Sequence, residues 1–260
     1  MKKFFVLLLS FITAAALRGA GELRLADATG GAPLEAVMQA ALTLSMAEEL
    51  SVSMQRQLPT AALTALEAGK VDGVIIDRTF VPNKEVIPLA AEALALYIST
   101  ANPGAKVTKA QVGEILKAFH PSWKDYNRLN LDIQRVVMKP LTPSGTLIRR
   151  IFGNNALADE VFMVDSFSSG FTFINSAAVF FAQYIPQAPV EVKCMPVNGV
   201  MPTTADIVSG KYPLSLHYVI VYREKSPELL RLIDKLKEEK YRRSMIDSGL
   251  IVLLPRISAP

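Results

Sequence analysis

The sequence predicts an α/β fold, and two observations support this prediction. Half of the 260 residues are hydrophobic and a fifth are charged, which suits a globular chain of one large domain or two lobes. After residue 20, strand-like and helix-like patterns follow in the order strand, helix, strand, helix, strand up to residue 77. That order favours parallel strands with helices packed on the sheet.

The first twenty residues form a segment of their own. Lys2 and Lys3 precede an apolar run over residues 4–17, and cleavage points follow Ala16 and Ala20. This order of charged, apolar and small residues predicts a secretory signal peptide at residues 1–20. The run is short for a membrane span, which needs about 20 apolar residues, and an uncleaved anchor is the alternative. No Cys follows the run, so a lipid anchor is not supported.

Removal of this segment makes the protein nearly neutral. Without Lys2, Lys3 and Arg18, the 28 basic residues fall to 25, against 24 acidic ones. The remaining chain has no block of Lys and Arg and no basic stripe with aromatic residues. Nucleic acid is therefore not an expected partner.

The cysteine and histidine residues predict neither a disulfide nor a metal site. Cys194 is the single cysteine, and no Cys/His cluster has the spacing of metal ligands. His120 lies in a loop-like segment and His217 begins a strand-like run, far apart in the sequence. We expect both histidines to be structural, and we expect no metal and no cofactor.

In the first part of the chain, each element is predicted by its own pattern. Residues 23–26 alternate like a strand, and Pro33 suits the first position of a helix that extends to about residue 49. The apolar positions of that helix, at three- and four-residue spacing, are Leu34, Val37, Met38, Ala41 and Leu42. Residues 50–55 alternate again, which predicts the second strand.

The later elements are predicted in the same way. The predicted strands are residues 71–76, 94–99, 135–138, 190–195 and 218–222, and the predicted helices are residues 60–69, 108–119, 144–152, 204–209 and a final long helix from Ser226. The last helix has an apolar face of Leu229, Leu232, Ile233 and Leu236. The apolar run 86–100 also fits a helix, but we expect its second half to be a strand because a turn and a fresh capped helix follow it.

One short helix has a start that suits anion binding. Ser144-Gly145-Thr146 precedes apolar positions at 147, 148, 151 and 152, and Gly153 is placed to end the helix. Hydroxyls and unpaired backbone N–H groups at a helix N-terminus attract anions. The same residues are also typical of an ordinary helix cap, so the motif alone does not distinguish an anion-binding site from a cap.

Six segments from Val71 onward match, in the same order, the motifs of one known family. The segments are Val71–Arg78, Ile87–Pro103, Val107–Leu116, Ser122–Asp125, Pro143–Thr146 and Val197–Ser215. Pro143–Thr146, for example, stands where that family has Gly-Ser-Gly-Thr. The chain resembles the phosphate-type periplasmic substrate-binding proteins of ABC transporters, as a divergent member.

The resemblance implies a two-lobed periplasmic-binding-protein fold of type II. Each lobe would be a mainly parallel sheet flanked by helices, and two hinge strands would join the lobes. Lobe one is placed at residues 21–97 plus 212–260 and lobe two at residues 98–211. The resemblance also implies a monomeric periplasmic protein that binds phosphate or another small oxyanion and has an ABC permease at the inner membrane as its partner.

Three loops are expected to meet in a cleft between the lobes, because open α/β sheets place ligands at the carboxyl ends of strands. The candidate ligand-binding residues are Thr29, Gly30, Asp77, Arg78, Ser144, Gly145 and Thr146. The resemblance gives Asp77 the role of accepting the remaining proton of the ligand, which favours hydrogen phosphate over sulfate. The alternative is that Asp77 and Arg78 cap the next turn or pair with each other.

Some positions depart from the family pattern. Pro140 stands where relatives carry an Arg four residues before the serine, and Lys139 would face the opposite way in a strand. Pro143 replaces the first Gly of the family loop, and residues 57–60 stand where many relatives have Gly-Ser-Gly. The first motif, residues 29–34, keeps only its Thr, Pro and Leu. Loss of a bidentate Arg would weaken anion binding.

Two functions remain open at this point. The first is an exported solute-binding protein that captures phosphate or a similar oxyanion for ABC-type uptake. The alternative, favoured by the lost Arg, is a ligand-free module of the same fold that acts as a sensor or interaction partner. An enzyme is not expected, because Ser144 lacks a Gly-x-Ser-x-Gly context and neither histidine has a catalytic one.

Overall fold

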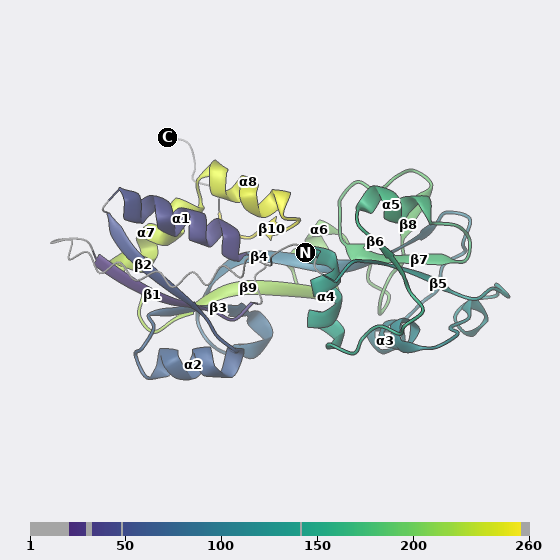
Figure 1. The fold of residues 1–260 in the computed structure, drawn as a ribbon, viewed down its shortest axis with the longest axis horizontal. Coiled ribbons are helices and arrows are strands. Elements are labelled where there is room, and N and C mark those ends of the chain that lie inside the picture. Colours follow the sequence, from purple (N-terminus) through teal and green to yellow (C-terminus); the bar gives the residue numbers. More distant parts are fainter. Residues whose placement is uncertain (1–20, 30–32, 48, 141, 256–260) are drawn as a thin grey trace, which may run out of the picture.

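Two lobes joined by two long strands make up the fold (Figure 1). The computed structural model describes residues 21–29, 33–47, 49–140 and 142–255. Within these residues, the sheet has the strand order β2-β1-β3-β9-β4-β7-β5-β6, and β8 and β10 also pair with β4. No helix in this part of the chain is long and apolar enough to cross a membrane. The expected signal peptide lies outside the described residues.

Lobe one holds one end of the sheet and helices on both of its faces. Its strands are β1 (Gly21–Asp27), β2 (Leu50–Arg56), β3 (Gly73–Asp77), β9 (Ser215–Tyr222), β10 (Ile251–Val252) and the first half of β4 (Val86–Ser99), and its helices are α1 (Leu34–Met46), α2 (Pro59–Glu67), α7 (Pro227–Leu236) and α8 (Glu239–Asp247). β1 pairs in parallel with β2 and β3, as the strand–helix alternation predicted. β9 pairs with β3 and β4 in the antiparallel direction.

Lobe two has the same layered construction. It contains the second half of β4, the strands β5 (Gln134–Met138), β6 (Phe162–Val164), β7 (Ala178–Gln183) and β8 (Val192–Cys194), and the helices α3 (Lys109–Lys117), α4 (Pro143–Phe152), α5 (Phe167–Thr172) and α6 (Thr204–Val208). β5 pairs in parallel with β6 and β7, whereas β4 is antiparallel to β7 and β8. Trp123, in a 3₁₀ turn at Trp123–Asp125, is buried in the core of this lobe.

Strand β4 joins the lobes because it changes its partner midway. Residues 86–93 pair with β9, and residues 94–98 pair with β7. The chain returns to lobe one through β9, where Leu216 packs against the hydrophobic clusters of both lobes. The two predicted hinge strands are therefore present. The strand begins at Val86 rather than at residue 94, because a register shift beside Pro88 accommodates a residue that cannot donate a ladder hydrogen bond.

Two predicted helix starts are wrong by one residue. α4 begins at Pro143, and the side chain of Thr142 accepts the Gly145 N–H at 3.1 Å, so Thr142 rather than Ser144 caps the helix. α2 likewise begins at Pro59, before Thr60. In both cases proline takes the first helical position, where no N–H is needed.

The core-facing side of α1 also differs from the prediction. Met38 and Leu42 are exposed, and the buried positions instead include Ala36, Ala40 and Leu44. The other three predicted positions, Leu34, Val37 and Ala41, are buried, so that part of the prediction is confirmed. The final helix, by contrast, is confirmed, since Ser226 caps α7 and all four predicted apolar side chains are buried.

Candidate ligand-binding site

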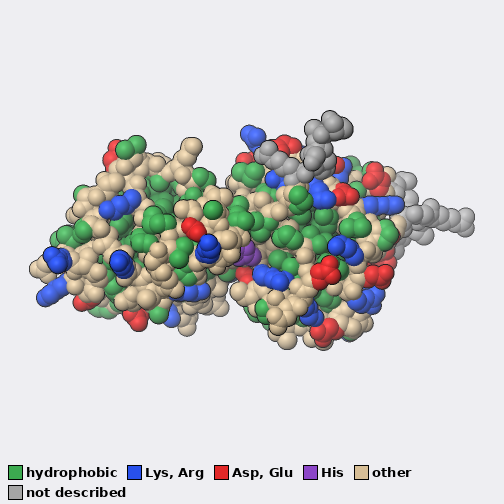
Figure 2. All heavy atoms as spheres, turned by 180° about the vertical axis from the view of Figure 1, so that it is seen from behind, with side chains coloured by type: hydrophobic (Ala, Val, Ile, Leu, Met, Phe, Trp, Pro, Cys, Tyr) green, Lys and Arg blue, Asp and Glu red, His purple; other side chains and the backbone are tan. Residues whose placement is uncertain are grey.

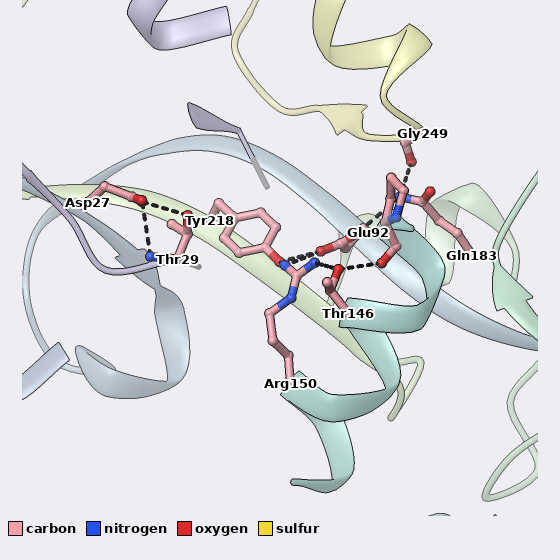
Figure 3. A network of polar contacts seen from close by, with 9 residues as sticks. Asp27, Thr29, Glu92, Thr146, Arg150, Gln183, Tyr218 and Gly249 are labelled. Carbon is pink, nitrogen blue, oxygen red and sulfur yellow. Dashed lines mark hydrogen bonds and ion pairs between the residues drawn. The ribbon is translucent and has the colours of Figure 1, made fainter. Parts of the chain in front are cut away.

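The predicted site residues lie where the strand ends of lobe one face helix α4 of lobe two. β1 ends at Asp27 and β3 ends at Asp77, and β4 and β9 run between these ends and α4. Figure 3 shows Asp27 and Thr29 on one side of Tyr218, with Thr146 and Arg150 of α4 on the other. In the space-filling view, the surface narrows to a waist between the lobes (Figure 2).

Thr29 lies at the end of β1 and is nearly buried. Its hydroxyl donates to Asp27 Oδ1 at 2.6 Å, and its backbone N–H donates to the same oxygen at 3.1 Å. Asp27, which the sequence did not single out, is therefore the residue that positions Thr29. Arg56 of β2 lies 3.7 Å from the second oxygen of Asp27. Gly30 lies outside the described residues.

The two carboxylate oxygens of Asp77 lie in different environments. Oδ1 accepts the Thr79 backbone N–H at 2.8 Å and the Thr79 hydroxyl at 2.6 Å, which caps the 3₁₀ turn Arg78–Phe80. Oδ2 is buried and has no hydrogen-bond partner among the described residues. Capping, one of the alternatives for Asp77, is thus present, and it leaves the second oxygen available for another donor.

Arg78 turns away from Asp77 and binds its own loop. Its guanidinium donates to the carbonyl oxygens of Lys84 and Pro82, each at 2.9 Å. These bonds tie the side chain to residues 82–84 of its own loop. The role of Arg78 as a ligand contact stays a prediction that the geometry does not favour.

The start of α4 is tightly connected to its surroundings. The Ser144 hydroxyl accepts the Gln183 backbone N–H at 2.9 Å, and Thr146 donates its hydroxyl to the Pro143 carbonyl at 2.7 Å. A Cβ on Gly145 would lie 2.2 Å from the Lys139 carbonyl oxygen, so only glycine lets the helix approach β5 this closely. The side chain of Lys139 forms an ion pair with Asp165 at 2.6 Å.

A buried polar network at the hinge contains residues that the sequence analysis missed. Arg150, one turn after Thr146 on α4, places Nη1 2.6 Å from Glu92 Oε1 and also donates to the Tyr218 hydroxyl. The Tyr218 hydroxyl donates to the same Glu92 oxygen. Gln183 Nε2 donates to the other Glu92 oxygen at 3.0 Å. Helix α4, both hinge strands and β7 therefore meet at one carboxylate.

The network lies beside Asp77. Tyr218 is directly opposite Asp77 in the pairing of β9 with β3. Burial raises the pKa of Glu92, the nearby Asp77 charge raises it further, and Arg150 lowers it. Burial raises the pKa of Tyr218 far above its usual value, and the charge of Glu92 adds to this. Tyr218 therefore remains a neutral hydroxyl donor at physiological pH.

One signal for this network was present in the sequence. Glu92 is the only charged residue in the apolar run 86–99, and a lone buried charge needs a partner. Nothing in the sequence indicated that Arg150 is that partner, because 58 residues separate them. Arg150 also supplies a guanidinium that position 140 lacks, from the same helix that begins at Pro143.

The histidines lie outside this network. His217 Nε2 lies 2.7 Å from the Ile207 carbonyl oxygen, and His120 lies in lobe two, 3.9 Å from Glu160. Among the described residues, no group of three or more His, Cys, Asp or Glu side chains could hold a metal ion.

No protein-family model and no curated protein sequence matches this chain. Solved structures do match it along almost its whole length. An ABC-type phosphate transport receptor from Vibrio cholerae superposes with a TM-score of 0.60 at 23% identity, over 88% of this chain and 99% of that chain. PstS from Borrelia burgdorferi gives 0.68 at 14% identity, over 89% of this chain and 98% of that chain. A "possible phosphate binding protein" from Planctomyces limnophilus gives 0.69 at 18% identity, over 91% and 94%.

The chain has the type II periplasmic binding protein fold. Within this fold, both lobes contain parallel strands flanked by helices, and each also contains antiparallel strands next to the hinge. The names of the Vibrio cholerae and Planctomyces limnophilus structures refer to phosphate transport and phosphate binding. At 14–23% identity these matches establish the fold, and the role of each site residue depends on the geometry described above.

Proposed function

We propose that this chain is an exported solute-binding protein that captures hydrogen phosphate, or a similar protonated oxyanion, between its two lobes for ABC-type uptake. The observation that carries the proposal is the free oxygen of Asp77. This oxygen is buried at the carboxyl end of β3 and has no hydrogen-bond partner among the described residues. A buried acceptor without a donor is unfavourable, so a ligand that brings its own proton would stabilise the site.

This acceptor distinguishes between anions of similar size. Hydrogen phosphate can donate its proton to Asp77 Oδ2, whereas sulfate has no proton to donate and is repelled by the carboxylate. The positive end of α4 and the Arg150 guanidinium lie on the lobe-two side of the same junction. The similarity in fold to structures named for phosphate transport and binding agrees with this choice of ligand.

Calorimetric titration with phosphate, arsenate, sulfate and molybdate tests the proposal. We expect phosphate and arsenate to bind, and sulfate to bind at least about 100-fold more weakly, which corresponds to about 2.7 kcal/mol. Asp77→Asn replaces the acceptor oxygen by an amide and should weaken phosphate binding at least about tenfold. Asp234→Asn, on the exposed side of α7, is the matched control and should change nothing. Equal phosphate affinity in all three proteins would refute the role of Asp77.

A second function is supported by the bonds that α4 already makes. Ser144, Thr146 and Arg150 all have partners within the protein. This arrangement fits a ligand-free module of the same fold that acts as a sensor or interaction partner. If no anion in the panel binds, and the purified protein instead retains one specific protein partner, this second function replaces the first.

A further inference from the structure

The Glu92 carboxylate accepts hydrogen bonds from a set of donors that resembles an oxyanion-binding site. One oxygen receives the Arg150 guanidinium at 2.6 Å and the Tyr218 hydroxyl, and the other receives the Gln183 amide at 3.0 Å. Guanidinium, phenol and carboxamide are the groups that would bind one edge of a phosphate. In this structure all three bind a carboxylate from the protein's own hinge strand (Figure 3).

Two of the three donors, Arg150 and Gln183, are held in place by further hydrogen bonds. Arg150 Nη2 donates to Thr146 Oγ1 at 3.2 Å. The Gln183 backbone N–H donates to Ser144 at 2.9 Å, and its side-chain amide also donates to the Gly249 carbonyl of lobe one at 3.0 Å. Two of these supporting contacts are made by Ser144 and Thr146, the loop residues expected to bind the ligand. The donor set is therefore built into the candidate site rather than placed beside it.

Glu92 and Arg150 differ in their access to solvent. The side chain of Glu92 is 1% exposed, whereas that of Arg150 is 21% exposed. Solvent therefore reaches Arg150 but not Glu92, and an anion that contacts Arg150 meets a guanidinium already paired with a carboxylate. The Asp77 carboxylate lies across the strand pairing from Tyr218 and adds a second negative charge to the surroundings.

We propose that Glu92 is an internal competitor for the anion. Its carboxylate pairs with Arg150 in the place of the ligand and thereby sets the affinity of the cleft. This proposal rests on the anion capture proposed above, because it describes how the same site is tuned. It predicts that removal of the Glu92 charge, with the shape of the side chain kept, increases the affinity for phosphate.

The test uses Glu92→Gln, which keeps an oxygen for the Tyr218 and Arg150 donors and removes the charge. Phosphate titrations of the wild type, Glu92→Gln and the double variant Glu92→Gln/Arg150→Gln are compared, after thermal melts show that each is folded. We expect Glu92→Gln to bind phosphate at least tenfold more tightly, equivalent to about 1.4 kcal/mol. The double variant should lose this increase in affinity, because the increase comes from the Arg150 guanidinium that Glu92→Gln releases.

The outcomes separate this inference from the function on which it rests. If the wild type binds phosphate and Glu92→Gln binds no more tightly, the competitor role is refuted and anion capture stands. If only Glu92→Gln binds, the competitor role is supported, and phosphate capture by the wild type is refuted. If neither folded protein binds, both proposals are refuted.

Discussion

Replacement of Gly145 by alanine tests whether the start of α4 must touch the end of β5. A Cβ at this position would lie 2.2 Å from the Lys139 carbonyl oxygen and 2.9 Å from that of Met138. Both neighbours are backbone atoms, of Met138 at the end of β5 and of Lys139 directly after it, so neither can rotate away. To reach an ordinary contact distance, helix and strand must separate by about 1 Å, and such overpacking costs about 1–3 kcal/mol. Alanine recovers up to about 1 kcal/mol in helix propensity, so we expect a net loss of about 1–2 kcal/mol.

Urea unfolding followed by tryptophan fluorescence suits this measurement. Trp123 is the only tryptophan in the sequence and lies in the core of lobe two, the lobe that carries α4. The matched control is Gly113→Ala in the middle of α3, where the new Cβ would meet only the mobile ring of Phe152 at 3.3 Å. We expect this control to be neutral or stabilised by about 0.5–1 kcal/mol. The reasoning fails if both variants shift the urea midpoint in the same direction by the same amount.

Two further predictions concern buried or paired charges away from the site. The Arg135 guanidinium donates to carbonyl oxygens at the end of α3 and to the carbonyl oxygen of Glu160. Arg135→Met removes this buried donor, so it should destabilise lobe two by at least about 2 kcal/mol in the same urea assay. An unchanged urea midpoint would refute this prediction. The Arg24 guanidinium holds the pKa of Asp72 below its usual value, so this pair stabilises the fold above the unfolded pKa and loses its effect as pH falls through the folded pKa. Asp72→Asn should therefore lower the melting temperature at pH 7 and have little effect near pH 2, and an equal loss at both pH values would contradict the linkage.

Local patterns in the sequence were sufficient to predict much of the fold. Alternation and three- to four-residue spacing identified β2 and α7, because one face of each packs on a core and the other meets solvent. The same reasoning missed the first half of β4. Its residues are buried almost throughout, so they show no alternation that would distinguish a strand from a buried helix.

The site was less predictable than the fold, since its contacts join distant residues. The resemblance places an arginine at position 140, where this chain has Pro140, and the guanidinium at the junction comes from Arg150, about two turns into α4. Its partner Glu92 is 58 residues away, and Tyr218 is 126 residues from Glu92. Such pairs depend on how the lobes pack. The spacing of residues within one helix or strand predicts only which residues of that element share a face.

The charges at the junction narrow the choice of ligand. Asp27 is bound by Thr29 and lies near Arg56, and Glu92 is paired with Arg150, so each of these carboxylates has a compensating group. Asp77 has a hydrogen-bonded oxygen but no ion-pair partner among the described residues, and its other oxygen is unbound. The uncompensated charge of the site is therefore negative.

A fully ionised anion would be repelled by this charge, and hydrogen bonds from the start of α4 would have to offset the repulsion. An anion that carries a proton instead converts the repulsive contact into a charge-assisted hydrogen bond of the stronger kind. Selectivity for the protonated form thus arises from Asp77, while the strength of binding depends on how firmly Glu92 holds Arg150. The two properties are set by different residues, so Asp77→Asn should change the ratio of phosphate to sulfate affinity, and Glu92→Gln should raise both affinities together.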